Sequence, residues 1–208
     1  MQLAGLIILT TACPVECSHC AYSCKATKEP EKWMSEETIR MVAKEFSKNN
    51  INYVLISGGE PFYNLEKLEK CIDILLKYFK PTIAITTSGF WANNKNYIKR
   101  VLTSLKEKIN SLEISIDRFH IERVPLINIK MLLNECTKLK ISSGLRLILD
   151  KNSKFLIKTL DSIIKKYNPY LIPAITNKIG RAELFDNSSI GNNLLLNNFL
   201  SKIKTKKI

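Results

Sequence analysis

Residues 4–20, Ala-Gly-Leu-Ile-Ile-Leu-Thr-Thr-Ala-Cys-Pro-Val-Glu-Cys-Ser-His-Cys, join an unbroken apolar run to a cysteine-rich segment. The apolar run predicts a strand over residues 4–10 that is buried on both faces, as in a parallel sheet. Ligand sites of α/β proteins lie at the carboxyl ends of such strands. The cysteines that follow residue 10 are therefore expected at a functional edge of the sheet.

The alternation of strand-like and helix-like segments continues to about residue 175. Further strands are predicted over residues 53–57, 82–86, 112–116, 141–149 and 170–175. Helices are predicted from Ser35, which caps the first of them, and over residues 65–79, 97–109, 125–139 and 156–167. Six such units predict an α/β fold with parallel strands covered by helices. Because they are too few to close an eight-unit barrel, we expect a partial, TIM-like (β/α)6 barrel.

The length of 208 residues suits one sizeable domain. We expect this core domain to span residues 1–182. Residues 183–208 are expected to form a short basic tail, with one helix over residues 194–203.

The composition, 45% hydrophobic and 25% charged, is that of an ordinary globular protein. The apolar run near the start is too short to span a bilayer and lacks the features of a signal peptide, so a cytoplasmic protein without membrane partners is expected.

The formal net charge is +13, and only six of the 32 basic residues are arginine. Lysine acts as a solvated point charge, so this charge favours a lysine-coated surface over a nucleic-acid-binding face.

The six cysteines indicate a metal centre rather than a disulfide framework, because four of them lie within twelve positions: Cys13, Cys17, Cys20 and Cys24. Three thiolates spaced Cys-x3-Cys-x2-Cys can each bind one iron of a [4Fe–4S] cluster and leave the fourth iron open. Zinc is the alternative, with Cys13, Cys17 and Cys20 joined by His19 or Cys24. The two remaining cysteines are expected to be core residues: Cys71 and Cys136.

A second motif, Gly58-Gly59-Glu60-Pro61, follows the second predicted strand. With these two motifs at the ends of consecutive strands, the sequence resembles the radical S-adenosylmethionine superfamily over roughly residues 3–182. The resemblance implies an enzyme whose cofactors are a [4Fe–4S] cluster on Cys13, Cys17 and Cys20 and S-adenosylmethionine. It implies reductive cleavage of S-adenosylmethionine to a 5′-deoxyadenosyl radical that abstracts hydrogen from a substrate. A flavodoxin- or ferredoxin-type protein is the expected reductant.

The resemblance also carries cofactor-binding roles to particular positions. The Gly58–Pro61 segment (Gly58, Gly59, Glu60 and Pro61) would bind the methionyl amine of S-adenosylmethionine. Polar residues at the ends of the third and fourth strands would face its methionyl and ribose groups: Ser88, Ser115 and Asp117. Arg146, amid apolar residues, would meet the cofactor carboxylate or form an ion pair with a carboxylate of the barrel.

Two further motifs follow strands and are expected near the barrel mouth. In Asp117-Arg-Phe-His120, His120 is the candidate catalytic residue, as a substrate ligand or proton carrier. The alternative for His120 is a loop histidine with a local hydrogen bond. The other motif is Gly180-Arg181-Ala182.

The substrate is not specified by these motifs. There is no second cysteine cluster towards the C-terminus, so we expect a member of the superfamily without an auxiliary-cluster domain. A small barrel leaves a wide mouth, which suits a peptide or protein side chain. Two alternatives come from other classes: a basic zinc module that contacts nucleic acid, and an iron–sulfur electron carrier without cofactor cleavage. The electron carrier would leave the Gly58–Pro61 motif unexplained.

Overall fold

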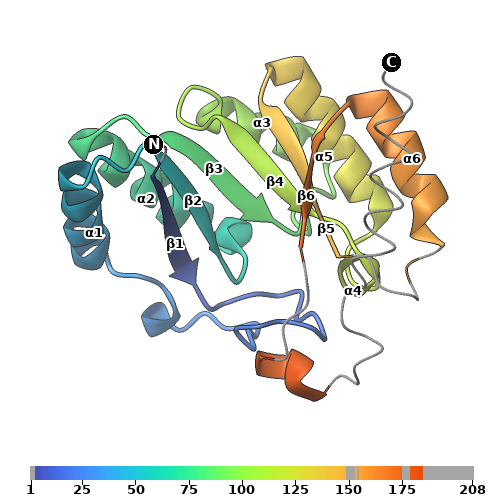
Figure 1. Ribbon diagram of the computed structural model, residues 1–208, viewed down its shortest axis with the longest axis horizontal. Coiled ribbons are helices and arrows are strands. Elements are labelled where there is room, and N and C mark those ends of the chain that lie inside the picture. The colour runs from blue at the N-terminus through green and yellow to red at the C-terminus, as the bar shows by residue number, and fades with distance from the viewer. Residues whose placement is uncertain (1–2, 149–152, 154, 175–178, 185–208) are drawn as a thin grey trace.

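The computed structural model describes residues 3–148, 153, 155–174 and 179–184, and these contain a six-stranded parallel sheet in the order β1-β2-β3-β4-β5-β6 (Figure 1). The strands are β1 (Ala4–Thr10), β2 (Tyr53–Gly58), β3 (Thr82–Thr87), β4 (Ser111–Ser115), β5 (Ser142–Leu147) and β6 (Tyr170–Pro173). Since β1 and β6 lie at opposite edges of this sheet, the barrel is open, and the predicted partial (β/α)6 fold is confirmed.

The helices of the crossover connections pack on one face of the sheet (Figure 1). They are α1 (Glu36–Lys48), α2 (Leu65–Tyr78), α3 (Lys95–Leu105), α5 (Leu126–Leu139) and α6 (Leu156–Tyr167). The shorter helical elements are α4 (Arg118–Ile121), η1 (Pro30–Lys32), η2 (Pro61–Tyr63) and η4 (Gly180–Leu184). The helix predicted over residues 194–203 lies outside the described residues.

Side-chain caps set the starts of several helices. The predicted cap Ser35 accepts a hydrogen bond from the backbone N–H of Thr38. The helix predicted over 97–109 instead runs over Lys95–Leu105, because Asn94 caps it by accepting from the N–H of Tyr97. The short helix α4 was not predicted, and it forms because Asp117 caps its first turn. Capping side chains thus set where these helices begin.

The core lies between the sheet and its helices. Alternate strand residues such as Ile7, Val54 and Ile85 are almost fully buried there. Gly5 belongs to the same face, where a Cβ atom would lie 2.5 Å from the ring of Phe46 in α1. Close contact between β1 and α1 therefore requires the absence of a side chain at residue 5.

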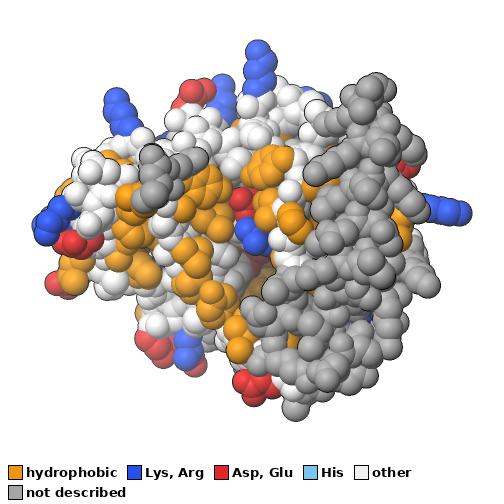
Figure 2. Space-filling view, viewed as in Figure 1, with side chains coloured by type: hydrophobic (Ala, Val, Ile, Leu, Met, Phe, Trp, Pro, Cys, Tyr) orange, Lys and Arg blue, Asp and Glu red, His pale blue; other side chains and the backbone are white. Residues whose placement is uncertain are grey.

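The inner face of the sheet is partly open, which corrects the prediction that residues 4–10 are buried on both faces. Ala4 is exposed, and Leu6 is 55% exposed. Figure 2 shows hydrophobic side chains gathered over the β1–β2 part of this face. The reason is the open barrel: β1 is an edge strand, and only its helix-facing side is covered in the described part of the chain.

At their carboxyl ends, β1 and β2 stay in contact beyond the regular ladder. Their register shifts between Ile8 and Thr10, so that Thr10 pairs with Gly58. Gly59 then donates its backbone N–H to the carbonyl of Thr10 at 2.6 Å, and Glu60 donates to the carbonyl of Ala12 at 2.9 Å. These bonds hold the first residues of the cysteine-rich segment against the end of β2.

Both glycines of the second motif are required by this close approach. Gly58 has a φ of +132°, and a Cβ atom there would lie 2.3 Å from the carbonyl oxygen of Thr10. A Cβ atom on Gly59 would lie 2.2 Å from the carbonyl oxygen of Ala12. The glycines thus allow two backbone segments to touch, in addition to any role towards a ligand.

We predict that Gly59→Ala lowers the free energy of unfolding by about 1–3 kcal/mol, because its methyl group forces the backbones of residues 12 and 59 apart. Ser57→Ala, two residues earlier on the same strand, is the matched control and should change it by less than about 0.5 kcal/mol. Urea denaturation of both variants measures the difference. Equal midpoints for Gly59→Ala and the wild type would contradict the steric argument.

Candidate active site

The carboxyl ends of the strands surround a cavity of about 310 Å³. Most of the predicted site residues line it: Cys13, Cys17, Cys20, Gly58, Gly59, Ser88, Ser115, Asp117, His120 and Arg146. Other lining residues were not predicted to belong to the site, among them Thr86 and Ile148. Thr86 could have been found from strand alternation, because it lies two residues before Ser88 and faces the same side of β3.

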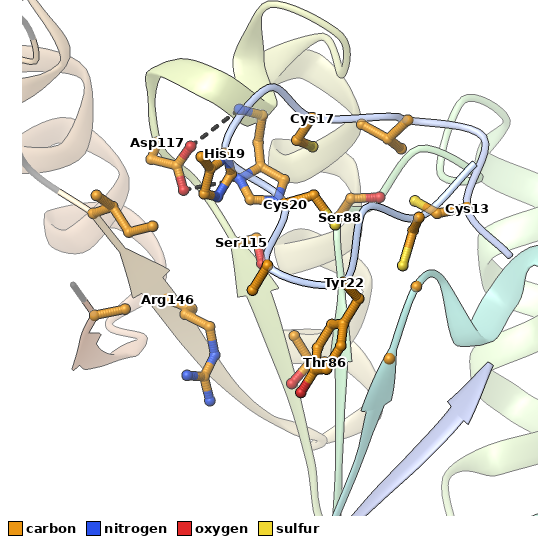
Figure 3. A pocket seen from close by; sticks show the side chains of 18 of the residues that line it. Cys13, Cys17, His19, Cys20, Tyr22, Thr86, Ser88, Ser115, Asp117 and Arg146 are labelled. Atoms are coloured by element: carbon orange, nitrogen blue, oxygen red, sulfur yellow. Dashed lines mark hydrogen bonds and ion pairs between the residues drawn. The ribbon is translucent and has the colours of Figure 1, made fainter. Parts of the chain in front are cut away.

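The cysteine-rich segment forms one wall of the cavity, and Figure 3 shows Cys13, Cys17 and Cys20 on one loop that arches over the strand ends. Cys13 and Cys17 are buried, whereas Cys20 is half-buried. The loop returns on itself, since the N–H of Cys13 donates to the carbonyl of Lys25 at 2.9 Å. Cys24, on the returning part, is 2% exposed and also lines the cavity.

The thiols of this loop differ in acidity. Burial raises the pKa of Cys13 to about 12. The hydrogen bond from Cys24 lowers the pKa of Cys20 to about 5, and the same bond raises the pKa of Cys24. Cys24, which the sequence offered as a possible fourth zinc ligand, therefore lies in contact with Cys20.

The Glu60 side chain, part of the segment predicted to bind the methionyl amine, lies behind the residues that line the cavity. Glu60 is fully buried and accepts hydrogen bonds from Ser88 Oγ at 2.5 Å, from the N–H of Ser88 at 2.8 Å and from Thr87 Oγ1 at 2.8 Å. Burial raises the pKa of this carboxyl, although these donors oppose the effect. Pro61 is also buried and starts η2. Neither residue lines the cavity, so Glu60 acts on it by orienting Ser88.

Asp117 holds the ring of His120, so the local hydrogen bond expected of the alternative interpretation, a loop histidine, is present. Asp117 Oδ2 lies 2.8 Å from His120 Nδ1, and Asp117 Oδ1 accepts from the N–H groups of Phe119 and His120 at 3.0 Å. Burial opposes charge on both residues, but their mutual attraction lowers the pKa of Asp117 and raises the pKa of His120 well above its ordinary value. Ligand atoms of His120 and Cys17 lie within 4.8 Å of each other, so the ring lies at the cysteine loop.

Arg146 forms the ion pair that was one of its two predicted roles. Its Nη2 lies 2.6 Å from Glu113 Oε2 in β4, and Glu113 Oε1 accepts a hydrogen bond from Tyr53 at 3.1 Å. The Glu113 side chain is 5% exposed and that of Arg146 is 31% exposed. Arg146 also lines the cavity, so the ion pair leaves it in reach of a ligand.

A second set of potential metal ligands includes two residues of the cysteine loop, Cys17 and His19. Ligand atoms of Cys17, His19 and His120 lie within 4.8 Å of one another. The ring of His19 stacks on Phe119, with centroids 4.4 Å apart. This set differs from the zinc ligands considered from the sequence, and it would compete with a cluster for Cys17.

The cavity has the properties of a ligand site. Among the described residues, four buried side-chain atoms lack a hydrogen-bond partner: His19 Nδ1, Thr86 Oγ1, Arg146 Nε and Arg181 Nη2. All four residues line this one cavity. Buried polar atoms are nearly always paired, so their concentration here indicates that a polar ligand supplies the missing partners. Three cysteines beside such a cavity fit an iron–sulfur cluster with an adjoining polar cofactor.

Solved structures share the fold of the chain. Streptococcus suis SuiB bound to S-adenosylmethionine matches all of the chain and 48% of its own, with a TM-score of 0.68 and 17% identity. SuiB bound to the precursor peptide SuiA gives a TM-score of 0.72 at 16% identity, and a radical SAM methyltransferase from Sphaerobacter thermophilus gives 0.69 at 16% identity. Both of these matches cover all of this chain. They cover 47% of the SuiA-bound SuiB chain and 63% of the methyltransferase chain.

Curated relatives are closer in sequence. The "Putative peptide biosynthesis protein YydG" of Bacillus subtilis is 30% identical over 164 residues, which are 76% of this chain and 50% of that protein. The mitochondrial GTP 3′,8-cyclase of Arabidopsis thaliana is 31% identical over 114 residues, or 53% of this chain and 27% of that protein. The chain thus spans at most half of the length of these two relatives.

In the described part of the chain, every helix is too short or too polar to cross a membrane. The family model of the radical SAM superfamily matches residues 7–160, which include both motifs, the second half of β1 and all of β2 to β5. Members of this family bind a [4Fe–4S] cluster and S-adenosylmethionine, the two cofactors expected from the motifs. The chain belongs to the radical SAM superfamily.

Proposed function

We propose that the chain is a radical SAM enzyme that modifies a peptide. The observation that carries this proposal is the cavity where three loop cysteines meet four side chains that each have one buried polar atom without a hydrogen-bond partner among the described residues. Cys13, Cys17 and Cys20 would hold the cluster. When bound, a [4Fe–4S] cluster with an open iron supplies the electron that cleaves S-adenosylmethionine into methionine and a 5′-deoxyadenosyl radical.

The residues around the cavity have distinct proposed roles towards S-adenosylmethionine. The backbone of Gly58 and Gly59, which lines the cavity, faces the methionyl part. Ser88 Oγ donates its hydrogen to Glu60, which leaves this oxygen to accept a hydrogen bond at the end of β3. Ser115 and Arg146 contact the cofactor from the other side, where the free Nε of Arg146 suits an acceptor such as a carboxylate.

The Asp117–His120 pair is proposed to act at the boundary between cluster and substrate. Asp117 is 1% exposed and fixes the ring of His120 through Nδ1. The ring lines the cavity next to Cys17. His120 is therefore the candidate residue for contact with the substrate or for holding a proton there, with Asp117 as its positioning residue.

A peptide is proposed as the substrate because the Bacillus subtilis relative is named for peptide biosynthesis. The open inner face of β1 and β2 supports this proposal, since exposed apolar side chains such as Leu6 offer a surface to a peptide. An external flavodoxin- or ferredoxin-type protein is proposed to reduce the cluster. On the face in Figure 2, Lys and Arg lie apart from one another, one near the centre beside an acidic side chain and the others around the rim, which does not favour a nucleic-acid groove there.

We predict that Cys17→Ala abolishes formation of 5′-deoxyadenosine, because the cluster loses one of three protein ligands. The protein is reconstituted with iron and sulfide without oxygen, reduced with dithionite, given S-adenosylmethionine and analysed by chromatography. Cys71→Ala is the matched control, since Cys71 is a fully buried core residue of α2 away from the cavity. It should retain iron and product.

Two outcomes would contradict the proposed function. Iron uptake without 5′-deoxyadenosine in the wild type would favour an electron carrier. Binding of one zinc and no iron would favour the zinc module. Cys24→Ala then separates the zinc ligand sets, because it removes zinc only if Cys24 is the fourth ligand.

We predict that Thr86→Val weakens binding of S-adenosylmethionine to the reconstituted protein by about 2- to 12-fold, the equivalent of one hydrogen bond of about 0.5–1.5 kcal/mol. Valine keeps the shape of threonine and removes only the hydroxyl that lacks a partner. Thr82→Val, at the exposed start of the same strand, is the control. Equilibrium dialysis gives both affinities, and an unchanged value for Thr86→Val would show that the ligand does not bond Oγ1.

A further inference from the structure

The short helix η4 (Gly180–Leu184), which comes after β6 in the sequence, contacts the cysteine loop. In Figure 1, η4 (Gly180–Leu184, red-orange) lies beside the blue loop that follows β1. β1 and β6 are the two edges of the open sheet and do not pair with each other. Contacts of η4 with the cysteine loop therefore join the two edges where the candidate active site lies.

One arginine makes most of these contacts. Arg181 Nε donates to the carbonyl of Cys17 at 2.8 Å, and Nη1 donates to the carbonyl of Cys24 at 2.8 Å. The backbone N–H of Arg181 donates to the carbonyl of Cys20 at 3.1 Å. A planar guanidinium with several fixed donors can hold two carbonyls of a curved loop at once, which a lysine ammonium on its flexible stem does less well.

The residue before the arginine brings the two backbones into contact. Gly180 has a φ of +60°, and a Cβ atom there would lie 2.4 Å from the carbonyl oxygen of Ala21 and 2.5 Å from that of Cys20. Only glycine allows this approach. The Gly180-Arg181 pair is therefore shaped to sit on the loop that carries the cysteines.

A donor of Arg181 is left over. Its Nη2 is buried and has no hydrogen-bond partner among the described residues, and the residue lines the cavity. With Nε and Nη1 bonded to the loop, the position of Nη2 is fixed by the protein. A fixed, buried, positively charged donor suits an anionic group in the cavity.

We propose that Arg181 is a positioning residue that holds the cysteine loop in shape before the cluster binds, and that its Nη2 donates to the bound cluster. The first part stands on the geometry of the loop alone. The second part rests on the proposed function, because it requires a cluster on Cys13, Cys17 and Cys20. Hydrogen bonds and positive charge near a cluster raise its reduction potential.

The first part is tested on the protein without its cluster by alkylation with iodoacetamide and mass spectrometry. Cys17 is 6% exposed in the folded loop, and Cys71 in α2 is 0% exposed and reports unfolding of the whole chain. We expect Arg181→Lys and Arg181→Met to speed alkylation of Cys17 at least tenfold, while Cys71 stays at the wild-type rate. Arg123→Lys, at an exposed position, is the matched control and should change neither rate.

Two results would overturn the first part. An unchanged rate for Cys17 in both variants would show that the loop keeps its shape without the arginine. Equal acceleration of Cys17 and Cys71 in both variants would show that Arg181 supports the whole fold rather than the loop. If only Arg181→Met accelerates alkylation of Cys71, the rate of Cys17 alkylation in Arg181→Lys decides between support of the loop and support of the whole fold. Lysine keeps the positive charge and loses only the planar fork of donors.

The second part is tested by redox titration of the reconstituted protein, followed by electron paramagnetic resonance. We expect a lower midpoint potential for Arg181→Met than for the wild type, and a smaller decrease for Arg181→Lys. Equal potentials for all three would overturn the contact between Nη2 and the cluster. If the wild type assembles no cluster, the proposed function fails, whereas the alkylation result on the cluster-free protein still stands.

Discussion

The hydrogen bond from the N–H of Gly59 to the carbonyl of Thr10 is the contact on which the candidate site depends. It continues the pairing of β1 and β2 past the end of the regular ladder, where the chain turns into the cysteine loop. A side chain at residue 58 or 59 would collide with the backbone of residues 10–12. The two motifs of the sequence are therefore one structural unit, since the glycines of the second hold the start of the first.

Buried polar groups extend this unit from strand to strand. Glu60 at the end of β2 accepts from Thr87 and Ser88 at the end of β3. Further along the sheet, Asp117 caps α4 and holds His120. Each of these buried carboxyl groups has hydrogen-bond partners, as burial of a polar group requires, and each orients a neighbour that lines the cavity. The walls of the cavity are thus fixed by bonds that lie behind them.

The open barrel explains the remaining polar groups inside the sheet. A closed barrel is filled by apolar layers, whereas here Glu113 on the inner face is paired with Arg146 and Tyr53. Such a pair stabilises the fold weakly, because desolvation offsets much of its attraction. The ion pair with Glu113 holds the guanidinium of Arg146 at the cavity. On the β1–β2 side the same face carries exposed apolar residues, so the interior offers both kinds of surface to a ligand.

The order of strands and helices could be predicted from the sequence, because unbroken apolar runs and capping residues such as Ser35 act locally. The sequence also predicted the positions of the cysteines and glycines, since both motifs directly follow strands. The roles of Glu60 and Cys24 could not be predicted, because their partners, Ser88 and Cys20, are set by how side chains turn in space. The exposure of Leu6 followed only from β1 being an edge strand. The contact of Arg181 with Cys17, 164 residues apart, likewise depends on the tertiary structure, because it joins η4 to the loop after β1 and no local pattern in the sequence links these two segments.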